Sequence, residues 1–274
     1  MAAVNAGRHR VARGALGNVR ALHDYALATE AAHPDAIHWI HIDPQRAGPD
    51  GVKELRRCID KKRGFLGYAV SASLSPPASE PTYQPYYNLC IEAGIPVLIF
   101  VGTTGLGAGL PGGDGVILDH CHPRHLDLVA ARNPQLRIVA ARPGWPWQAE
   151  VIAVLMHKRS IWYELHGWSP KYHTSDLKHE IPRRLKDRIL FGADYPLFSY
   201  ERLVRDWRAE GYAEEVLEKV FWRNAVADAP AGAADDRHLA FQSKVHAQIW
   251  PLKPTSAKKR SALRQNTFSS TSSA

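Results

Sequence analysis

The sequence predicts an α/β protein whose parallel strands are joined by helices. In the middle of the 274-residue chain, short apolar runs alternate with amphipathic segments, which is the pattern of repeated βα units. Several of the apolar runs are rich in valine and isoleucine, which is typical of strands buried in a parallel sheet. The order of the segments and the composition of the runs therefore favour a parallel sheet covered by helices.

Six apolar runs are predicted to be strands. They cover residues 36–42, 65–70, 96–101, 137–141, 161–165 and 188–191. Before residue 36 the sequence predicts one helix and no convincing strand, so the series of βα units starts late in the chain.

Helices are predicted before, between and after these strands. They cover residues 16–32, 83–93, 124–132, 148–157, 175–186, 200–210 and 213–226. Local signals mark several helix ends: Gly94 is typical of a C-cap, and His33-Pro34 and Asn133-Pro134 each follow a predicted helix.

The net charge of +8 arises largely from the end of the chain. A stretch without acidic residues contains Lys253, Lys258, Lys259, Arg260 and Arg264. The rest of the chain is only mildly basic and has no nucleic-acid-binding motif, so nucleic acid is not an expected partner. Residues 227–274, rich in alanine, serine, lysine and proline, are predicted to be a disordered basic C-terminal tail.

Cysteine usage and hydropathy predict a cytoplasmic protein. Cys58, Cys90 and Cys121 are widely spaced and odd in number, which favours reduced thiols over a disulfide framework. No apolar run is long enough to span a membrane, so a membrane is not an expected partner. The first residues lack the apolar core of a secretory signal, and an arginine-rich transit peptide is the alternative interpretation of that segment.

Four short segments that follow predicted strands carry the most specific signal. They are GTTGLGAGLPGGDG (102–115), RPGWPW (142–147), HGWSPKY (166–172) and FGADYP (191–196). In order and spacing they resemble the amidohydrolase-related family. The final segments ERLVRDW (201–207) and EEVLEKVFWRNA (214–225) resemble the last helices of that family. The resemblance covers approximately residues 18–225.

The resemblance implies a (β/α)8 TIM-type barrel. A closed barrel of this kind needs eight strands. Because six strands are predicted, we expect a distorted, incomplete α/β barrel that lacks its first strands and occupies residues 1–226. Members of the family are hydrolases and carbon–carbon lyases, including decarboxylases, that act on small, often aromatic, acids or on acyl derivatives.

The resemblance also implies a divalent metal, Zn²⁺ or similar, at the carboxyl-end mouth of the barrel. The family ligands are two histidines of an HxH motif after the first strand, a histidine from a middle strand and an aspartate after the last strand. The metal polarises a carbonyl group or lowers the pKa of bound water. A further histidine transfers protons.

Compared residue by residue, the chain keeps one position of this metal site. Asp194 matches the family aspartate, whereas Phe100 takes the position of the middle-strand histidine. Arg142 takes the position of the proton-transferring histidine, and a guanidinium cannot act as a base near neutral pH. The HxH motif has no counterpart before residue 36. The sequence therefore predicts that the metal is not retained and that the family reaction is impaired.

One alternative is a replacement metal site. His41 and Asp43 share a face at the end of a predicted strand, and His166 and Asp194 follow two other strands, so all four would lie at the same rim. An HxH at 120–122 lies in the long loop near that rim. The competing interpretation is that these histidines, among 14 in the chain, are surface or packing residues.

The same segments contain residues that fit a ligand pocket. Arg142 either binds a carboxylate bidentately or forms a salt bridge with Asp194 or Glu164. Three tryptophans follow predicted strands and either line a pocket for an aromatic or acyl ligand or fill the barrel mouth: Trp145, Trp147 and Trp168.

The sequence therefore predicts an amidohydrolase-related barrel protein whose partner, if it is active, is a small carboxylate or acyl substrate. Two rivals are a non-catalytic ligand- or partner-binding remnant of that barrel and a truncated gene product. The first and last strands of an incomplete barrel expose unpaired N–H and C=O groups. For this reason we expect the chain to self-associate.

Overall fold

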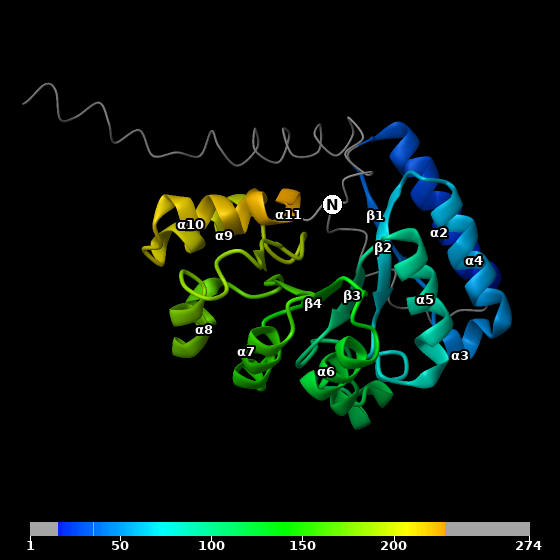
Figure 1. Ribbon diagram of the computed structural model, residues 1–274, viewed down its shortest axis with the longest axis horizontal. Helices are drawn as coiled ribbons and strands as arrows, with labels where there is room; N and C mark the ends of the chain where they lie inside the picture. Colours follow the sequence, from blue (N-terminus) through cyan, green and yellow to red (C-terminus); the bar gives the residue numbers. More distant parts are fainter. Residues whose placement is uncertain (1–15, 35, 228–274) are drawn as a thin grey trace, which may run out of the picture.

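The computed structural model describes residues 16–34 and 36–227. Its centre is a six-stranded parallel sheet in which the strands lie side by side in chain order (Figure 1). They are β1 His38–His41, β2 Phe65–Val70, β3 Val97–Phe100, β4 Ile138–Ala141, β5 Ile161–Glu164 and β6 Ile189–Leu190. Each strand lies within one of the predicted apolar runs, so the strand predictions are confirmed.

The sheet does not close into a barrel within the described residues. There, β1 pairs with β2 and β6 pairs with β5, and no ladder joins β1 to β6. This confirms the expected distorted, incomplete barrel for the part of the chain that the structure describes. The open edges follow from the number of strands, since a closed barrel of this kind has eight.

Helices precede the first strand, connect the strands and end the described chain. They are α2 Leu16–Ala32, α3 Pro44–Ala47, α4 Pro49–Asp60, α5 Gln84–Ala93, α6 Pro123–Arg132, α7 Gln148–His157, α8 Ser175–Glu180, α9 Tyr200–Ala209, α10 Glu214–Glu218 and α11 Asn224–Ala227. In Figure 1, α2, α4 and α5 lie to the right of the strands, α6 below them, and α7 and α8 to the left. The helices therefore surround one face of a curved sheet.

Two helical predictions need correction, and one helix was missed. The helix expected over residues 175–186 ends at Glu180, because Pro182 has no N–H to continue the helical hydrogen bonds. The segment expected as one helix over 213–226 contains α10, a π-helix at Lys219–Arg223 and α11. Helix α4 was not predicted, although Pro49 at its first turn is a typical helix start.

The larger part of the apolar core lies between the sheet and the helices. Strand residues that point toward the helices are buried there, including Ile40, Tyr68, Ile99, Ile138 and Tyr163. The opposite, inner face of the sheet carries a smaller cluster made of Ala69, Leu98, Phe100, Val139 and Ala141, with Trp39, Trp162 and Leu190 packed against it. Because side chains alternate along a strand, both faces of the sheet are apolar.

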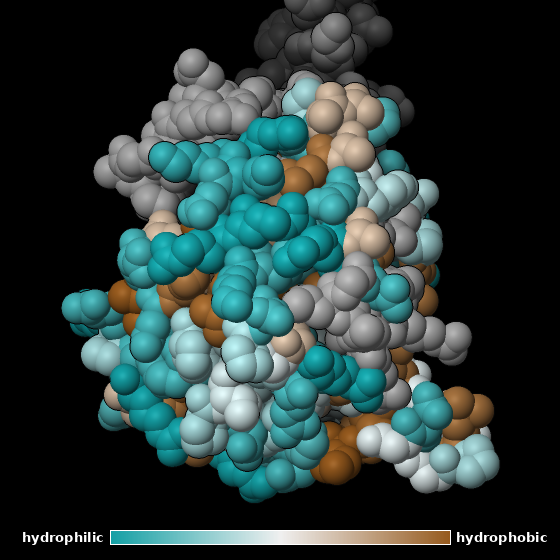
Figure 2. Space-filling model, turned by 90° about the vertical axis from the view of Figure 1, so that its right-hand side faces the viewer, coloured by the Kyte–Doolittle hydropathy of each residue, from teal (hydrophilic) through white to brown (hydrophobic). Residues whose placement is uncertain are grey.

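The helical exterior is mostly polar on the side that carries α2 and α4 (Figure 2). Figure 2 presents the side of the molecule with α2 and α4, and its surface is predominantly hydrophilic. Among the described residues, no helix combines the length and the apolar character that crossing a membrane requires. The tail predicted for residues 227–274 lies outside the described residues, apart from Ala227 at the end of α11.

Candidate functional site

The carboxyl ends of β3 to β6 bring inner-face residues into one row. Phe100 pairs with Ala141, Ala141 with Glu164, and Glu164 with Leu190. Parallel α/β barrels place their functional groups at this edge, because the loops that leave the strands converge there. The residues of this row, and those immediately after it, therefore form the candidate site, which we call the rim.

Arg142 follows β4 and lies against Phe100 at the rim. The guanidinium carbon of Arg142 is 4.8 Å from the centroid of the Phe100 ring, within the range of a cation–π contact. Burial lowers the pKa of Arg142, and Asp194 acts against this by favouring its charged form. Within residues 16–34 and 36–227, the guanidinium forms no hydrogen bond or ion pair. The alternative salt bridge to Asp194 or Glu164 is therefore not formed there.

Glu164 and His166 form a hydrogen-bonded pair beside Arg142. Glu164 is the last residue of β5, and Nδ1 of His166 is hydrogen-bonded to its Oε2 atom. Both side chains are largely buried, with 15% of Glu164 and 12% of His166 exposed. The imidazole packs edge to face with Phe100, with ring centroids 5.7 Å apart. Phe100 thus contacts Arg142 and His166 together.

Asp194 lies next to this pair. Its Oδ2 atom is 3.2 Å from the place that a Cβ atom on Gly167 would take, so Asp194 lies beside the segment that follows His166. Asp194 and Arg142 both have left-handed backbone conformations, with φ of 56° and 77°. Such conformations cost energy for residues other than glycine and concentrate at functional sites. Two of them at one rim support a functional assignment.

Two of the three predicted tryptophans lie together. The rings of Trp145 and Trp168 stack with centroids 6.4 Å apart, and Tyr172 contacts Trp168 edge to face. Half of Trp145 is exposed, so this aromatic shelf, defined as Trp145, Trp168 and Tyr172, faces solvent. Trp147 instead packs against His122, with ring centroids 4.7 Å apart, and is not part of the shelf.

His41, the last residue of β1, and Asp43, two positions further on, lie on the opposite side of the sheet from β5 and β6. Both are buried, and the carboxylate of Asp43 accepts a hydrogen bond from the backbone N–H of Gln45, 3.0 Å away, as the N-cap of α3. Asp43 and His120 also line a polar hollow of about 400 Å³. Its lining includes neither His166 nor Asp194, so the hollow does not unite the four residues of the predicted replacement metal site.

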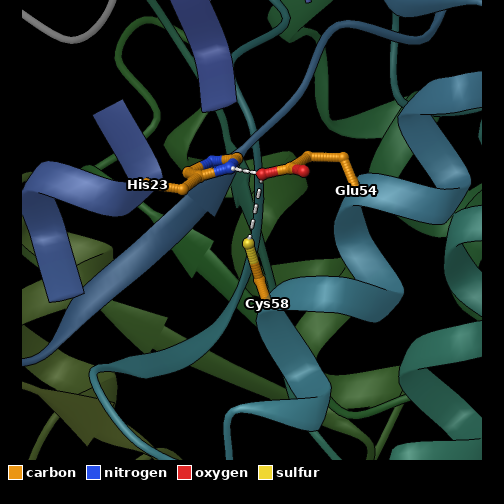
Figure 3. Close-up of side chains that lie close together, drawn as sticks. All are labelled: His23, Glu54 and Cys58. Carbon is orange, nitrogen blue, oxygen red and sulfur yellow. Dashed lines mark hydrogen bonds and ion pairs between the residues drawn. The ribbon is translucent and has the colours of Figure 1, made fainter. Parts of the chain in front are cut away.

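Only one set of three metal-ligating side chains converges within the described residues. His23, Glu54 and Cys58 have potential ligand atoms within 4.8 Å of one another, between α2 and α4 (Figure 3). The Glu54 carboxylate already accepts hydrogen bonds from His23, from Arg20 and, through two nitrogens, from Arg57. These two arginines compensate the charge of the carboxylate, so the set is a buried salt-bridge cluster that joins α2 to α4.

The pKa directions at this cluster agree with that conclusion. Burial raises the pKa of Glu54, but the hydrogen bonds from His23, Arg57 and Arg20 outweigh burial and hold the pKa well below its ordinary value. Burial, reinforced by Glu54, raises the pKa of the Cys58 thiol. A protonated thiol is a poor metal ligand.

The sequence interpretation considered Glu164 only as a salt-bridge partner of Arg142 and did not identify the cluster of His23, Glu54 and Cys58. A signal for the first was present, because Glu164 and His166 are two apart at a strand end and so share a face. The second cluster combines α2 with the unpredicted helix α4, so no local pattern revealed it.

Solved structures with a similar fold include two decarboxylases and an uncharacterised TIM-barrel protein. A 2,6-dihydroxybenzoate decarboxylase from Rhizobium is 19% identical with a TM-score of 0.63, the match covering 82% of this chain and 81% of that one. An uncharacterised TIM-barrel protein from Bordetella bronchiseptica is 20% identical with a TM-score of 0.60, covering 81% and 73%. A 5-carboxyvanillate decarboxylase from Novosphingobium aromaticivorans, solved with manganese, is 17% identical with a TM-score of 0.59, covering 78% and 71%.

Sequence comparisons give the family directly. No curated protein matches the chain. A family model described as amidohydrolase matches residues 3–227, which include all six strands and the whole rim. This match spans well over half of the chain and agrees with the fold of the similar structures. The chain therefore belongs to the amidohydrolase family.

Proposed function

We propose that this protein binds a small aromatic carboxylate at the rim, with Arg142 as the anion-binding group. The observation that carries the proposal is a largely buried guanidinium that rests on Phe100 and forms no hydrogen bond or ion pair within the described residues. Guanidinium and carboxylate groups match in a bidentate hydrogen-bonded pair. Burial strengthens such a pair, because the surrounding dielectric is low.

The aromatic shelf supports an aromatic ligand. Trp145 and Trp168 follow β4 and β5, the strands that lead to Arg142 and His166, and half of Trp145 is exposed. Exposed ring faces at the mouth of a site offer stacking surfaces to a planar ligand. Two proteins of similar fold are decarboxylases of aromatic carboxylates, 2,6-dihydroxybenzoate and 5-carboxyvanillate, which supports the same ligand class here.

The residues of the rim do not fit the family metal. Phe100 offers no ligand atom where a histidine is expected, and the permanent cation of Arg142 would repel a divalent metal beside Asp194. We therefore propose binding without the metal-dependent turnover of the family. The manganese in the structure of the 5-carboxyvanillate decarboxylase is a property of that relative.

A cytoplasmic location belongs to the same proposal. Cys58, Cys90 and Cys121 are all buried free thiols. Free thiols persist most readily in a reducing compartment. Fractionation of the native host cells tests this location independently of ligand binding.

The direct test is calorimetric titration of the full chain with benzoate, comparing the wild type with Arg142→Gln. The wild type should bind benzoate, and the variant should bind at least tenfold more weakly, since a hydrogen bond to a charged group contributes roughly 1.5–3 kcal/mol. Arg142→Lys keeps the charge and loses the planar fork, so its affinity should lie between the two.

Arg205→Gln is the matched control, because Arg205 is an exposed arginine on α9. It should leave benzoate binding unchanged. The proposal is wrong if the wild type does not bind benzoate, or if Arg142→Gln binds it as tightly as the wild type does.

A further inference from the structure

A serine, a histidine and an aspartate from three separate segments meet outside the rim. Nδ1 of His125, in the first turn of α6, is 2.8 Å from Oγ of Ser79, in the connection between β2 and α5. Nε2 of the same imidazole is 3.7 Å from Oδ2 of Asp119, in the 3-10 turn Leu118–Cys121. The imidazole therefore lies between a hydroxyl group and a carboxylate.

The carboxylate determines which imidazole nitrogen carries the proton. A carboxylate only accepts hydrogen bonds and attracts an N–H group, so the proton of the neutral imidazole lies on Nε2, which faces Asp119. Nδ1 then carries the lone pair and accepts the hydrogen bond that the Ser79 hydroxyl donates. In this arrangement His125 is a general base next to a serine whose proton it can take.

Asp119 is itself held in place beside the imidazole. Arg124 donates a hydrogen bond to Oδ1 of Asp119, while Oδ2 faces His125. At 3.7 Å the contact between Oδ2 and Nε2 is longer than a hydrogen bond, so Asp119 acts on His125 through its charge. That charge stabilises the imidazolium that forms when His125 takes a proton.

His125 is available as a base near neutral pH. Burial and the neighbouring Arg124 lower the pKa of His125 below its ordinary value of 6.5, whereas Asp119 raises it. The first turn of α6 acts in the same direction as burial, because a helix N-terminus disfavours positive charge. The imidazole is therefore neutral at pH 7, which is the state that accepts a proton.

Ser79 lines a pocket of about 210 Å³. Four apolar residues contribute to the same lining, namely Ala78, Pro81, Tyr87 and Val129, and no residue of the rim does. A pocket of this size and composition accommodates a small apolar group. The serine therefore lies beside a space that suits a short acyl chain.

Arg132 lines the same pocket and provides positive charge there. Its Nη1 atom donates a hydrogen bond to the backbone carbonyl oxygen of Ser79, 3.0 Å away, so the guanidinium lies next to the serine. A guanidinium has five N–H donors, and among the described residues this is the one hydrogen bond that its side chain forms. The other donors can bind an ester carbonyl oxygen as negative charge develops on it.

We propose that Ser79, His125 and Asp119 form a serine hydrolase site for small acyl esters. Ser79 is the nucleophile, His125 the general base, Asp119 the positioning residue and Arg132 the group that binds the oxyanion. The arrangement has the geometry and roles of a catalytic triad, with the two imidazole nitrogens exchanged. Since it uses no residue of the rim, it does not depend on the function proposed above.

The reaction needs an ester and water. Oγ of Ser79 bonds to the carbonyl carbon while its proton passes to Nδ1 of His125, and the carbonyl oxygen becomes an oxyanion beside Arg132. The bond to the alkoxide then breaks, and the alcohol leaves with the proton from Nδ1. Water attacks the acyl-serine in the same way and gives its proton to His125. When the acid leaves, that proton returns to Oγ of Ser79, so the net products are one acid and one alcohol.

A fluorophosphonate probe tests the nucleophile directly, because an activated serine displaces its fluoride and keeps the phosphonyl group. After labelling of the full chain at pH 7.5, peptide mass spectrometry should find the added mass on Ser79. Ser79→Ala should abolish this labelling, and His125→Gln should slow it roughly 100-fold or more, the contribution expected of a general base. Ser175→Ala, at an exposed serine at the start of α8, is the matched control and should label like the wild type.

Hydrolysis of 4-nitrophenyl butyrate tests turnover. The wild type should release nitrophenol in excess EDTA, and Ser79→Ala should not exceed the uncatalysed rate. The value of kcat/KM should rise as His125 loses its proton and be constant above pH 7, because the pKa lies below 6.5.

The pH profile also separates positioning by Asp119 from a merely structural role. Arg124 and Asp119 are the charged groups that act on His125, and Glu80 and Arg132 line the pocket beside it. Asp119→Asn removes the charge that raises the pKa of His125, so the inflection should move to lower pH while the plateau rate falls. A purely structural loss would lower the rate without moving the inflection.

Ser79→Cys keeps a nucleophile and guards against a loss of folding in Ser79→Ala. The three native cysteines are buried, so iodoacetamide should alkylate the introduced thiol first. His125→Gln in the same chain should slow this alkylation, because the thiolate loses its base.

Three results would overturn the proposal. They are the absence of probe on Ser79, labelling of Ser79 that does not depend on His125, and ester hydrolysis that survives in Ser79→Ala or disappears in EDTA. In the last case the hydrolysis would belong to another site or to a bound metal, and the contact between Ser79 and His125 would only join the β2–α5 connection to α6.

Discussion

The carboxylate of Glu164 occupies the space that a side chain on Gly192 would fill. Gly192→Ala should therefore displace Glu164 and break its hydrogen bond to His166. Overpacking of a buried site costs about 1–3 kcal/mol, and urea denaturation should show a loss of stability in this range.

Gly105→Ala is the matched control for this substitution. A Cβ atom on Gly105 has no neighbouring atom within 4 Å, and its backbone is outside the left-handed region. The control should keep the stability of the wild type. Equal stability of Gly192→Ala and the wild type would contradict the packing of Glu164 against Gly192.

His173 predicts a specific loss of stability in acid. It is buried against Trp207, and burial, with a smaller contribution from Lys178, lowers its pKa from 6.5 to about 3. The unfolded chain therefore binds a proton that the folded chain does not bind between these pH values. The free energy of unfolding should fall as the pH decreases from 6.5 toward 3.

His173→Phe tests this contribution, since a phenyl ring packs without titrating. The variant should lose less stability than the wild type between pH 6.5 and 4, as measured by urea denaturation at several pH values. His179→Gln, at an exposed position of α8, should retain the wild-type pH dependence. Parallel pH profiles for the wild type and His173→Phe would show that His173 is not the responsible group.

Glu54 should contribute strongly to the attachment of α2 to α4. Its side chain is fully buried and accepts hydrogen bonds from His23 and Arg57. Removing one partner of a buried ion pair costs about 3–5 kcal/mol, because the other charges remain uncompensated. Glu54→Gln should show a loss of this size in thermal or urea denaturation.

Glu92 provides a matched exposed pair. It binds Arg56 through two hydrogen bonds, and 64% of its side chain is exposed. Solvent screens such a pair, so Glu92→Gln should have little effect on stability. Similar losses for the two variants would show that burial is not what gives the Glu54 cluster its importance.

The metal content of the purified protein tests the chemistry of the rim. With Phe100 and Arg142 at two family positions, we expect well under one divalent metal per chain after mild dialysis, measured by elemental analysis. A stoichiometric metal that disappears in His41→Ala or His166→Ala would establish the replacement site instead. A metal lost only in Cys58→Ala would place it between α2 and α4.

The open outer edge of β1 predicts self-association. Within the described residues no strand pairs with that edge, whereas at β6 the side chain of Asn224 donates to the carbonyl of Ile189 and the N–H of Phe191 donates to the carbonyl of Val220, so part of that edge is covered. Burying backbone groups unpaired costs roughly 1–3 kcal/mol each. Size-exclusion chromatography with light scattering should show oligomers whose proportion rises with concentration. A monodisperse monomer with a cooperative melting transition would mean that residues outside 16–34 and 36–227 cover the edge of β1.

Much of the fold was predictable because its signals are local. Apolar runs mark all six strands, and the helix over Gln148–His157 was predicted with its observed bounds. Helix α4 escaped prediction because only one side of it is apolar and its buried face includes the charged residue Glu54. The end of α8 was misplaced although Pro182 marks it.

The sequence by itself determined the family, the parallel order of the strands, the incomplete barrel and the identities of Asp194, Phe100 and Arg142 at family positions. These properties depend on motifs and on residue periodicity, which are local. Only the tertiary structure decided that Arg142 rests on Phe100 without an ion pair, and that Glu164 holds His166 beside the same ring. The reason is physical: these contacts join different strands, and sheet register and packing set their distances, which sequence spacing does not encode.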